Sequence, residues 1–338
     1  MLPRRERERN KYGRCAFERQ VGVGLIPLLN IIQILGLFLG FSLAMPLAPL
    51  FSVLLLAAAA SATPLAVRAA DPTGTIQCPI VFDGRVPTTL VSTDLDDATR
   101  SPFNTGYVKG EGLKWSDIIK FPTEVGQPRF ENSSSHKPIT VTLSDRSIFQ
   151  TQRGFRRAGL QFKDDANTGG RGAVGVRTLH WSVKIDPARG LNLSHEYLNV
   201  WHETADYSAN QFNFEMGSIL GQPDLPSDTF KILDRRNQQI WSTPIDETAW
   251  NNFAVTIDYD KNTLRIYYSK NDEPLKAASC TASPNDNSGE GQYQLGLLKK
   301  PTGTDDVVNS GYQASGIDEG LIYGGIFLED SADGCVSL

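Results

Sequence analysis

Short runs of alternating apolar and polar residues recur along the chain from residue 71 onward. Clusters of Gly, Pro, Asn and Asp separate these runs, and no helical period persists between them. Because successive side chains of a strand point to opposite faces, this alternation predicts strands that bury one face. The predicted strands are residues 80–82, 139–143, 155–162, 177–185, 197–203, 211–216, 229–234, 253–259, 263–269, 293–298 and 321–329.

The spacing of these strands predicts an all-β fold. No strand–helix–strand spacing is present, which favours two packed antiparallel sheets of the sandwich or jelly-roll kind. Neither a repeat nor an interdomain linker interrupts residues 71–338, so we expect a single domain there. The 338-residue chain is 40% apolar and 21% charged, a composition that excludes a disordered or collagenous protein.

The first 70 residues have a different composition. The stretch from Val21 to Val67 is almost uncharged and rich in Leu, Ala, Ile and Phe. From Met45 onward it forms a short apolar core that ends in Ala60-Ser61-Ala62, the small-x-small pattern of a signal-peptidase site. We therefore expect a targeting segment over residues 1–70, with the true start at Met45 and cleavage between Ala62 and Ala70.

A signal anchor is the alternative interpretation of the same segment. The apolar stretch from Val21 to Val67 exceeds the roughly 20 residues that span a bilayer, which would make the chain a type II membrane protein. Both interpretations place residues 71–338 outside the cytosol. We expect a secreted, extracellular protein that has no membrane association after signal cleavage.

The charge distribution bears on the partners of the domain. The chain has 33 basic and 38 acidic residues, but residues 1–70 hold eight of the basic and three of the acidic ones, which leaves a net charge of −10 on residues 71–338. Nucleic-acid binding needs clustered Lys and Arg, so nucleic acids are excluded as partners. Nothing in the sequence indicates a cofactor, a metal site or an obligate oligomer, and we expect a monomer.

The cysteines and sequons agree with an extracellular domain. Cys78 and Cys335 lie near the two ends of the domain, and a bridge between them would tie both ends together. Cys280 is then the odd thiol, in a polar loop, and we expect it to be free. Asn132 and Asn192 begin Asn-x-Ser sequons and are candidate glycosylation sites.

Two neighbouring strands predict a polar face that carries an aromatic residue. If residues 204–209 form the turn of a hairpin, Trp201 lies opposite Gln211. Asn199 then lies opposite Asn213. The residues that share this face are Glu203, Trp201, Asn199, Gln211, Asn213 and Glu215.

Such a face has the chemistry of a sugar-binding surface. Aromatic rings stack on the apolar faces of pyranoses, and amides and carboxylates bind the hydroxyls. An ordinary solvated sheet face remains the alternative, because the outward faces of antiparallel sheets are polar in soluble proteins. His180 lies on the polar face of its own strand, and His202 is expected to be a hydrogen-bonded neighbour at the end of an inward row.

Several separated motifs span essentially all of residues 76–338. They are Cys78-Pro-Ile-Val-Phe-Asp-Gly-Arg85, Phe155-Arg-Arg-Ala158, Arg177-Thr-Leu-His-Trp-Ser182, Leu193-Ser-His-Glu-Tyr197, His202-Glu-Thr-Ala-Asp-Tyr-Ser-Ala-Asn-Gln-Phe212, Tyr323-Gly-Gly-Ile-Phe-Leu-Glu-Asp-Ser331 and Gly334-Cys-Val-Ser337. Together these motifs resemble glycoside hydrolase family 131, secreted fungal enzymes that act on β-glucans.

The resemblance implies a fold, a reaction and a disulfide. The fold is a β-jelly roll of two antiparallel sheets with a substrate groove on the concave sheet. The reaction is hydrolysis of β-1,3-, β-1,6- and often β-1,4-linked glucans by carboxylates, without a metal or cofactor and with inversion of configuration. The resemblance also supports a disulfide between Cys78 and Cys335.

The resemblance also implies the catalytic residues. One family glutamate corresponds to Glu203, and the second follows a segment that matches Phe155-Arg-Arg-Ala158, where this chain has Gly159. Two carboxyls normally divide the work of glycoside hydrolysis. The chain therefore either uses another carboxylate, hydrolyses weakly, or binds glucan without cutting it. The candidate replacements are Glu215, Asp164 and Asp165.

We expect Glu203 and His180 at the catalytic centre, with Glu203 in the acid/base pair. Trp201 would be a stacking platform, and Asn210, Gln211 and His180 would bind sugar hydroxyls. Arg157 would tune the pKa of a carboxylate. Arg157 and Gln161 share the strand face of Gly159, and both are expected to bind substrate together with Asn199, Asn213 and Glu215.

Two other functions compete with hydrolysis. A non-catalytic glucan-binding lectin on the same fold is favoured by Gly159. A polysaccharide lyase of the jelly-roll kind is disfavoured, because a domain with net charge −10 repels anionic uronates.

Overall fold

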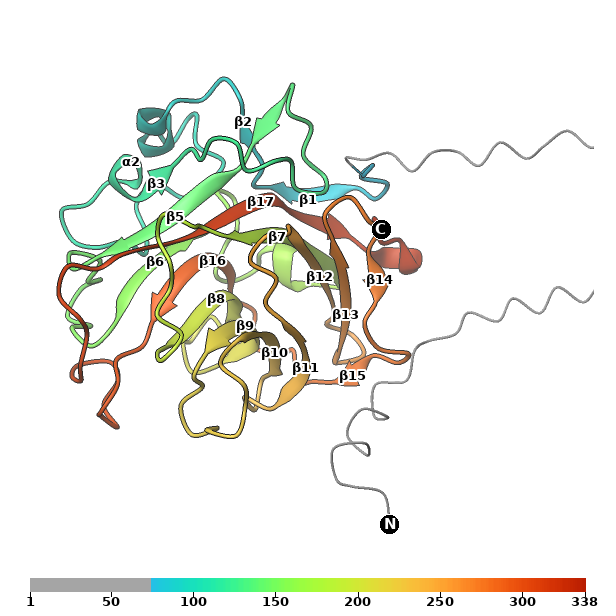
Figure 1. The fold of residues 1–338 in the computed structure, drawn as a ribbon. Helices are drawn as coiled ribbons and strands as arrows, with labels where there is room; N and C mark the ends of the chain where they lie inside the picture. Colours follow the sequence, from blue (N-terminus) through green and yellow to red (C-terminus); the bar gives the residue numbers. More distant parts are fainter. Residues whose placement is uncertain (1–73) are drawn as a thin grey trace, which may run out of the picture. The chain divides into compact units, whose positions relative to one another are not determined.

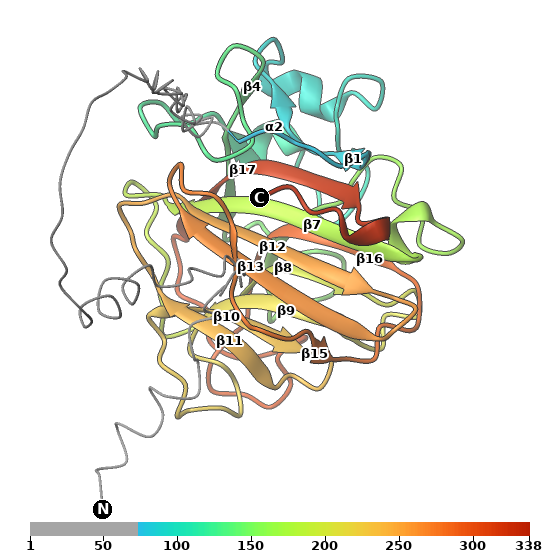
Figure 2. The same ribbon diagram turned by 90° about the vertical axis from the view of Figure 1, so that its right-hand side faces the viewer.

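The computed structural model describes residues 74–338, which belong to one compact unit. Two antiparallel sheets form two layers (Figures 1 and 2). The expected start at Met45, the cleavage site and the apolar segment lie outside the described residues and stay predictions. Within residues 74–338, no helix is long and apolar enough to cross a membrane.

The larger sheet has nine strands. Its strands in order are β14 (Lys276–Ala277), β13 (Thr263–Lys270), β12 (Asn251–Asp258), β7 (Val176–Ile185), β17 (Asp318–Asp330), β5 (Ile139–Ser144) and β3 (Ile119–Lys120), with β1 (Ile80–Asp83) on β17 and β15 (Ser283–Pro284) on β13.

The smaller sheet has six strands. In order they are β11 (Gln239–Pro244), β10 (Thr229–Asp234), β9 (Asn210–Gly217), β8 (Glu196–Glu203), β16 (Gln292–Lys299) and β6 (Arg156–Leu160). Outside both sheets lie β2 (Val86–Pro87), β4 (His136–Lys137), the short helix α2 (Trp115–Ile118) and the 3₁₀ turns η1 (Ser92–Asp96), η2 (Arg171–Ala173) and η3 (Ala332–Gly334).

The all-β prediction is confirmed, and each predicted strand has a counterpart among these elements. The strand β11, an edge strand that ends at Pro244, and the two-residue strands were not predicted. The prediction of two packed antiparallel sheets is also confirmed, because the strand pairs of both sheets are antiparallel.

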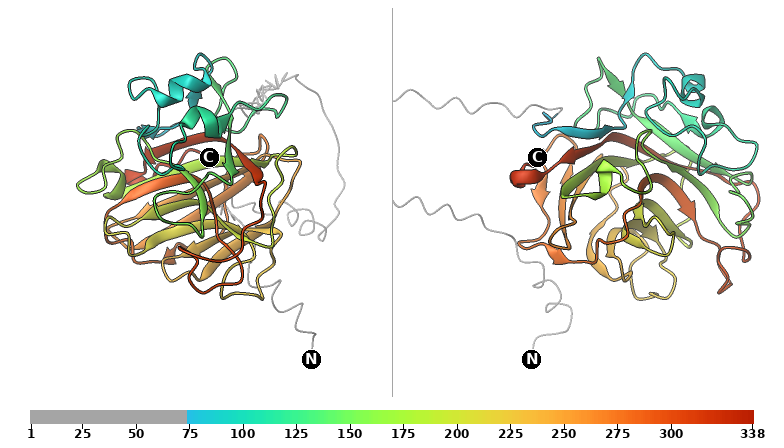
Figure 3. Two further views of the ribbon diagram at one scale, coloured as in Figure 1. Left: turned by 90° about the vertical axis from the view of Figure 1, so that its left-hand side faces the viewer. Right: turned by 180° about the vertical axis from the view of Figure 1, so that it is seen from behind.

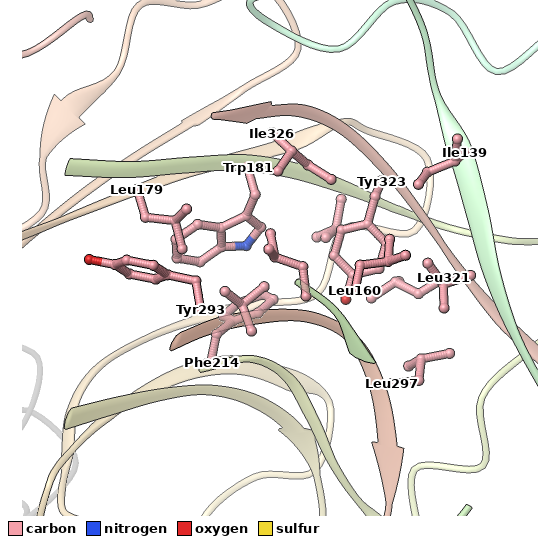
Figure 4. Close-up of a cluster of buried hydrophobic side chains, with 14 of the residues drawn as sticks. Ile139, Leu160, Leu179, Trp181, Phe214, Tyr293, Leu297, Leu321, Tyr323 and Ile326 are labelled. Atoms are coloured by element: carbon pink, nitrogen blue, oxygen red, sulfur yellow. The ribbon is translucent and has the colours of Figure 1, made fainter. Parts of the chain in front are cut away.

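The core lies between the two sheets. Trp181 of β7 stacks on Phe253 of β12 at 5.5 Å and meets Phe214 of β9 edge-on at 5.3 Å between ring centroids. Figure 4 shows Trp181 and Phe214 pointing toward each other from opposite layers. The alternating residues of β7 and β9 therefore place these rings in the core between the sheets.

Tyr323 of β17 links the two layers at the middle of the six-stranded sheet. Its hydroxyl faces the carbonyl oxygens of Asn199 in β8, at 3.1 Å, and of Gly296 in β16, at 2.5 Å. The pairing of β8 with β9 shifts register between Leu198 and Val200. The pairing of β16 with β8 shifts register between Leu295 and Leu298. The bulges are therefore held by a side chain from the opposite sheet.

A disulfide joins Cys78 to Cys335, whose Cα atoms are 5.9 Å apart, which confirms the expected pairing. Figure 3 shows the red turn η3 beside the blue strand β1. The expectation that Cys280 is free was wrong, because Cys280 is also disulfide-bonded, and no cysteine of the described part is free.

Candidate active site

The candidate active site is built around Glu203, the last residue of β8. Trp201 and Glu203 lie on the face of the six-stranded sheet that points away from the core, which we call the outer face. Glu203 pairs with Asn210 of β9 and with Gln292 of β16. Its side chain is partly exposed, so solvent and substrate have access to this carboxyl.

Gln294 of β16 bridges Glu203 to Arg157 of β6. The Nε2 atom of Gln294 donates a hydrogen bond to Oε2 of Glu203, and Nη2 of Arg157 donates to Oε1 of Gln294 at 3.2 Å. Burial raises the pKa of Glu203, and the charge of Arg157 and the Gln294 hydrogen bond offset only part of this rise. Glu203 therefore holds its proton to a higher pH than an ordinary glutamate, as a general acid must.

The guanidinium of Arg157 is fixed by aromatic rings. It lies 5.7 Å from the ring centroid of Phe149 and 5.8 Å from that of Trp201. Nη1 donates to Oε1 of Gln152 at 3.1 Å, and the whole residue is only 7% exposed. Arg157 therefore acts on Glu203 from a fixed position.

Tyr107 lies near Glu203, and Tyr207 from a different loop contacts Tyr107. Residues 102–108 run along the free edge of β6, with backbone hydrogen bonds at 2.9 to 3.0 Å, and bring Tyr107 next to Glu203. Burial raises the pKa of Tyr107, and contacts with Tyr207 and Glu203 raise it further, so its phenol stays protonated and can donate hydrogen bonds. Tyr207 is 59% exposed and has a φ of 61°, in the left-handed region.

Trp201 does not form the expected stacking platform. It is 1% exposed and packs with Phe155, Leu198 and Leu298 in a small cluster on the outer face. The segments that follow β5 and β16 cover it through Phe155 and Val307. The exposed aromatic residue of the β8–β9 hairpin is Tyr207, which was expected to lie in an ordinary turn.

Gln211 and Asn199 also leave the expected face, because the hairpin has two register shifts. Glu203 pairs with Asn210 and Trp201 with Asn213, so Gln211 lies in a bulge. Its Oε1 is 2.6 Å from Nδ1 of His202, and its Nε2 donates to Glu290 O at 2.8 Å. His202 is fully buried, and burial lowers its pKa to about 4, so it is the hydrogen-bonded neighbour that was predicted. Asn199 is fully buried in the other bulge.

The three other predicted amides, Asn210, Asn213 and Gln161, differ in their exposure to solvent. Asn210 is partly exposed beside Glu203, and its Nδ2 donates to Oδ1 of Asn213 at 2.8 Å. Asn213 is buried and donates to Asn237 at 3.0 Å. Gln161 is buried where residues 102–108 pair with the end of β6. Asn210 alone of these three has both access and proximity for a sugar hydroxyl.

None of the candidate second carboxylates is among the groups that shift the pKa of Glu203. Glu215 lies opposite Leu198, and at about 3.3 Å per residue that position is about 16 Å from Glu203, beyond the roughly 5 to 9.5 Å of paired glycosidase carboxyls. Asp165 is buried and accepts from the backbone nitrogen of Tyr293 at 2.8 Å. Asp164 lines a hollow formed with β1.

Glu215 belongs to a separate ionic cluster on the outer face. It is fully buried beside Glu196 and Lys231, and burial raises its pKa to about 8, with the charge of Glu196 adding to the rise. Glu196 is itself paired with Lys300. The substrate-binding role expected for Glu215 is not supported by this placement.

His180 is on the other sheet, so its predicted place at the catalytic centre was wrong. Its Nε2 lies 2.8 Å from Oε1 of Glu329, and its ring stacks on Phe327 at 4.3 Å. Glu329 also accepts from the backbone nitrogen and hydroxyl of Ser337. The polar face of β7 was correctly predicted, but neighbouring chain covers it and makes His180 a buried structural residue.

Gly159 faces the outer side of the sheet, as its strand alternation predicted. A Cβ atom built there would lie 2.7 Å from Oε1 of Gln294 and 3.5 Å from Trp201. The space beside Glu203 is therefore filled by the Gln294 amide, a residue that sequence analysis did not single out.

Asn132 and Asn192, the two sequon asparagines, are exposed. Each accepts a hydrogen bond from the hydroxyl of its own sequon serine, at 2.8 Å. Among residues 74–338, no group of three or more His, Cys, Asp or Glu side chains gathers as metal ligands would.

Residues 80–334 match the family described as the glycoside hydrolase 131 catalytic N-terminal domain. The chain is similar in structure to the GH131 beta-glucanase catalytic domain from Podospora anserina, with a TM-score of 0.59 and 18% identity over 76% of this chain and 97% of that one. The catalytic domain of the glycoside hydrolase family 131 protein from Coprinopsis cinerea gives a TM-score of 0.57 and 18% identity over 76% of this chain and 100% of that one. A search of curated proteins found no match. The two structures support the fold, and because the family match spans most of the sequence, the chain belongs to glycoside hydrolase family 131.

Proposed function

We propose that this chain hydrolyses β-glucans and that Glu203 is the carboxyl that protonates the leaving oxygen. The observation that carries the proposal is the environment of Glu203, a partly exposed carboxyl whose pKa is raised by burial and which Gln294 and Arg157 hold in place. A general acid needs this combination of access and raised pKa. Membership of a glycoside hydrolase family supports the reaction class.

Residues around Glu203 suggest how a glucan is held. Tyr207 offers an exposed ring to the apolar face of a pyranose. Tyr107 stays protonated and would donate to a sugar hydroxyl, and Asn210 would donate or accept. We propose β-1,3- and β-1,6-linked glucans, and also β-1,4-linked glucans, as substrates. We propose that hydrolysis inverts the configuration and that the protein acts as a secreted monomer outside the cell.

The experiment compares three polymers and two variants. The protein is incubated with laminarin, pustulan and a mixed-linkage β-glucan, and reducing ends are measured. We expect Glu203→Gln to lose about 10²- to 10⁴-fold in rate and to keep its affinity for glucan. Glu290→Gln, a change of the same kind at an exposed residue of the neighbouring loop, is the control. Full turnover by Glu203→Gln would refute the assignment.

Glucan binding without hydrolysis is the second candidate function, and one observation favours it. Among the groups that shift the pKa of Glu203 in the described structure there is no carboxylate, and position 159 carries no side chain. The two functions separate in affinity electrophoresis through laminarin gels beside the reducing-end assay. Retarded migration without product release, together with product release by Gly159→Glu, would favour binding. Product release by the unchanged protein would favour hydrolysis.

A further inference from the structure

The amide of Gln294 can lie in only one orientation between its two partners. Arginine has donors and no acceptor, so Arg157 must face the oxygen of the amide. The nitrogen then faces Glu203, and it donates to Oε2 of that carboxyl. The buried guanidinium of Arg157 therefore fixes the Gln294 amide so that its nitrogen always donates toward the partly exposed carboxyl of Glu203.

The absence of a side chain at residue 159 gives this amide its room. A Cβ atom at Gly159 would come within 2.7 Å of Oε1 of Gln294, closer than real Cβ contacts allow. The other sides of that position are closed by Val108 at 3.3 Å and Trp201 at 3.5 Å. Of these neighbours, the end of the Gln294 side chain is the one that can move, and its movement would break the contact with Arg157.

We propose that Gln294 is a positioning residue that holds Oε2 of Glu203 as a hydrogen-bond acceptor, and that Gly159 is required because any side chain there displaces the Gln294 amide. The catalytic consequence rests on the function proposed above for Glu203. The hydrogen-bonded contact does not depend on that function, because it involves only the side chains of Arg157, Gln294 and Glu203 and the space left by Gly159.

The proposal predicts the direction of a titration. A hydrogen bond donated to a carboxylate stabilises its charged form, so losing the bond raises the pKa of Glu203. The charged and titratable groups that face Glu203 are Arg157 from β6 and Tyr107 from residues 102–108, with Tyr207 acting through Tyr107. Both tested variants leave these three residues in the chain.

The test measures the pKa of Glu203 directly, by NMR titration of ¹³C-labelled glutamate side chains in the protein produced from the full chain. The Glu203 signal is assigned by its loss in Glu203→Gln. We expect Gln294→Leu and Gly159→Ala each to raise the pKa by about one unit. We expect the double variant to shift no further than either single one, because both remove the same hydrogen bond.

Gln292→Leu is the matched control. Gln292 is on the same strand and pairs with Glu203, but its Nε2 donates to the carbonyl of Asp165. We expect no shift in this variant. If Gln294→Leu leaves the pKa unchanged, or if Gly159→Ala leaves it unchanged while folded, the proposal is wrong.

The pH dependence of kcat/KM adds a readout of the catalytic role. If Glu203 is the general acid, the alkaline limb moves to higher pH in both variants, while a general base would move the acidic limb. An NMR shift in a protein that releases no product would support the positioning role and refute hydrolysis. Loss of rate without a shift in either limb would instead indicate a structural role for Gln294 and overturn the proposal.

Discussion

Replacing His180 by alanine separates a structural role from a catalytic one. The His180 ring is 1% exposed, stacks on Phe327 and contacts the buried carboxyl of Glu329. Burial alone would raise the pKa of Glu329, but hydrogen bonds from His180 and Ser337 lower it below its ordinary value. The variant therefore leaves a buried carboxyl with fewer donors and removes a ring from a packed cluster.

The expected loss in the free energy of unfolding follows from these two contacts. Losing a hydrogen bond to a charged group costs about 1.5 to 3 kcal/mol, and losing the stacked ring costs about 1 kcal/mol beyond its buried area. The vacated space adds to this, so we expect a total of about 3 to 5 kcal/mol at neutral pH. His180→Gln is the matched variant, because its amide can still donate to Glu329, and it should lose less.

Urea unfolding monitored by tryptophan fluorescence gives the stability, and reducing-end release from laminarin gives the rate. We expect His180→Ala to unfold at lower urea and, once corrected for the folded fraction, to hydrolyse at the rate of the parent. A variant with unchanged stability and a rate at least tenfold lower would refute the reasoning, because it would require His180 to act on substrate. If His180→Ala does not fold, the same comparison is made with His180→Gln.

Three further predictions concern the disulfide, the aromatic residues and pH. Replacing both Cys78 and Cys335 by alanine opens a loop of 257 residues and should cost up to about 5 kcal/mol of stability, measured by urea unfolding; an unchanged midpoint would contradict this. Tyr207→Ala should raise KM for laminarin about tenfold without loss of stability, whereas Trp201→Ala should destabilise by about 3 to 5 kcal/mol; the reverse pattern would restore Trp201 as the platform. Burial raises the pKa of Glu131 to about 7, so the folded state favours the neutral form of this carboxyl. The resulting contribution to stability is complete below the unfolded pKa of about 4.5 and declines as the pH rises toward 7. Glu131→Gln should remove that part of the decline in urea midpoints measured from pH 4 to 8, and an unchanged pH profile would show that Glu131 does not cause it.

The sequence predicted the faces of the strands well because side-chain alternation is a local property. Arg157 and Gly159 share one face of β6, and Trp201 and Glu203 share one face of β8, as expected from period-two alternation. The Cys78–Cys335 pairing was also correct.

The errors arose where distant parts of the chain decide the outcome. The bulge at Gln211 shifts the hairpin register, and its side chain is held by His202 and by the backbone of residues 288–290. Trp201 is covered by residues from two other segments, and His180 by the residues around Phe130 and Ser337. These are long-range contacts, which no pattern within a single strand encodes.

Tyr207 was missed for a different reason. It lies in a turn of short polar residues, Asp206 and Ser208 among them, which predicts only a loop. The available signal was an aromatic residue at the tip of a hairpin next to the candidate acid. The exposure of the Tyr207 ring and its positive φ indicate a functional residue, and neither property can be inferred from the sequence.

The position of β17 has a consequence for how the chain is made. Asp318–Asp330 is the last strand of the described chain, yet it lies in the interior of the nine-stranded sheet, between β7 and β5, and also carries β1. During synthesis, β7 and β5 therefore present unpaired edges until nearly the whole domain has emerged. The nine-stranded sheet therefore cannot be completed before residue 330 has been made, and a chain interrupted before residue 318 would lack the strand that joins the two parts of its largest sheet.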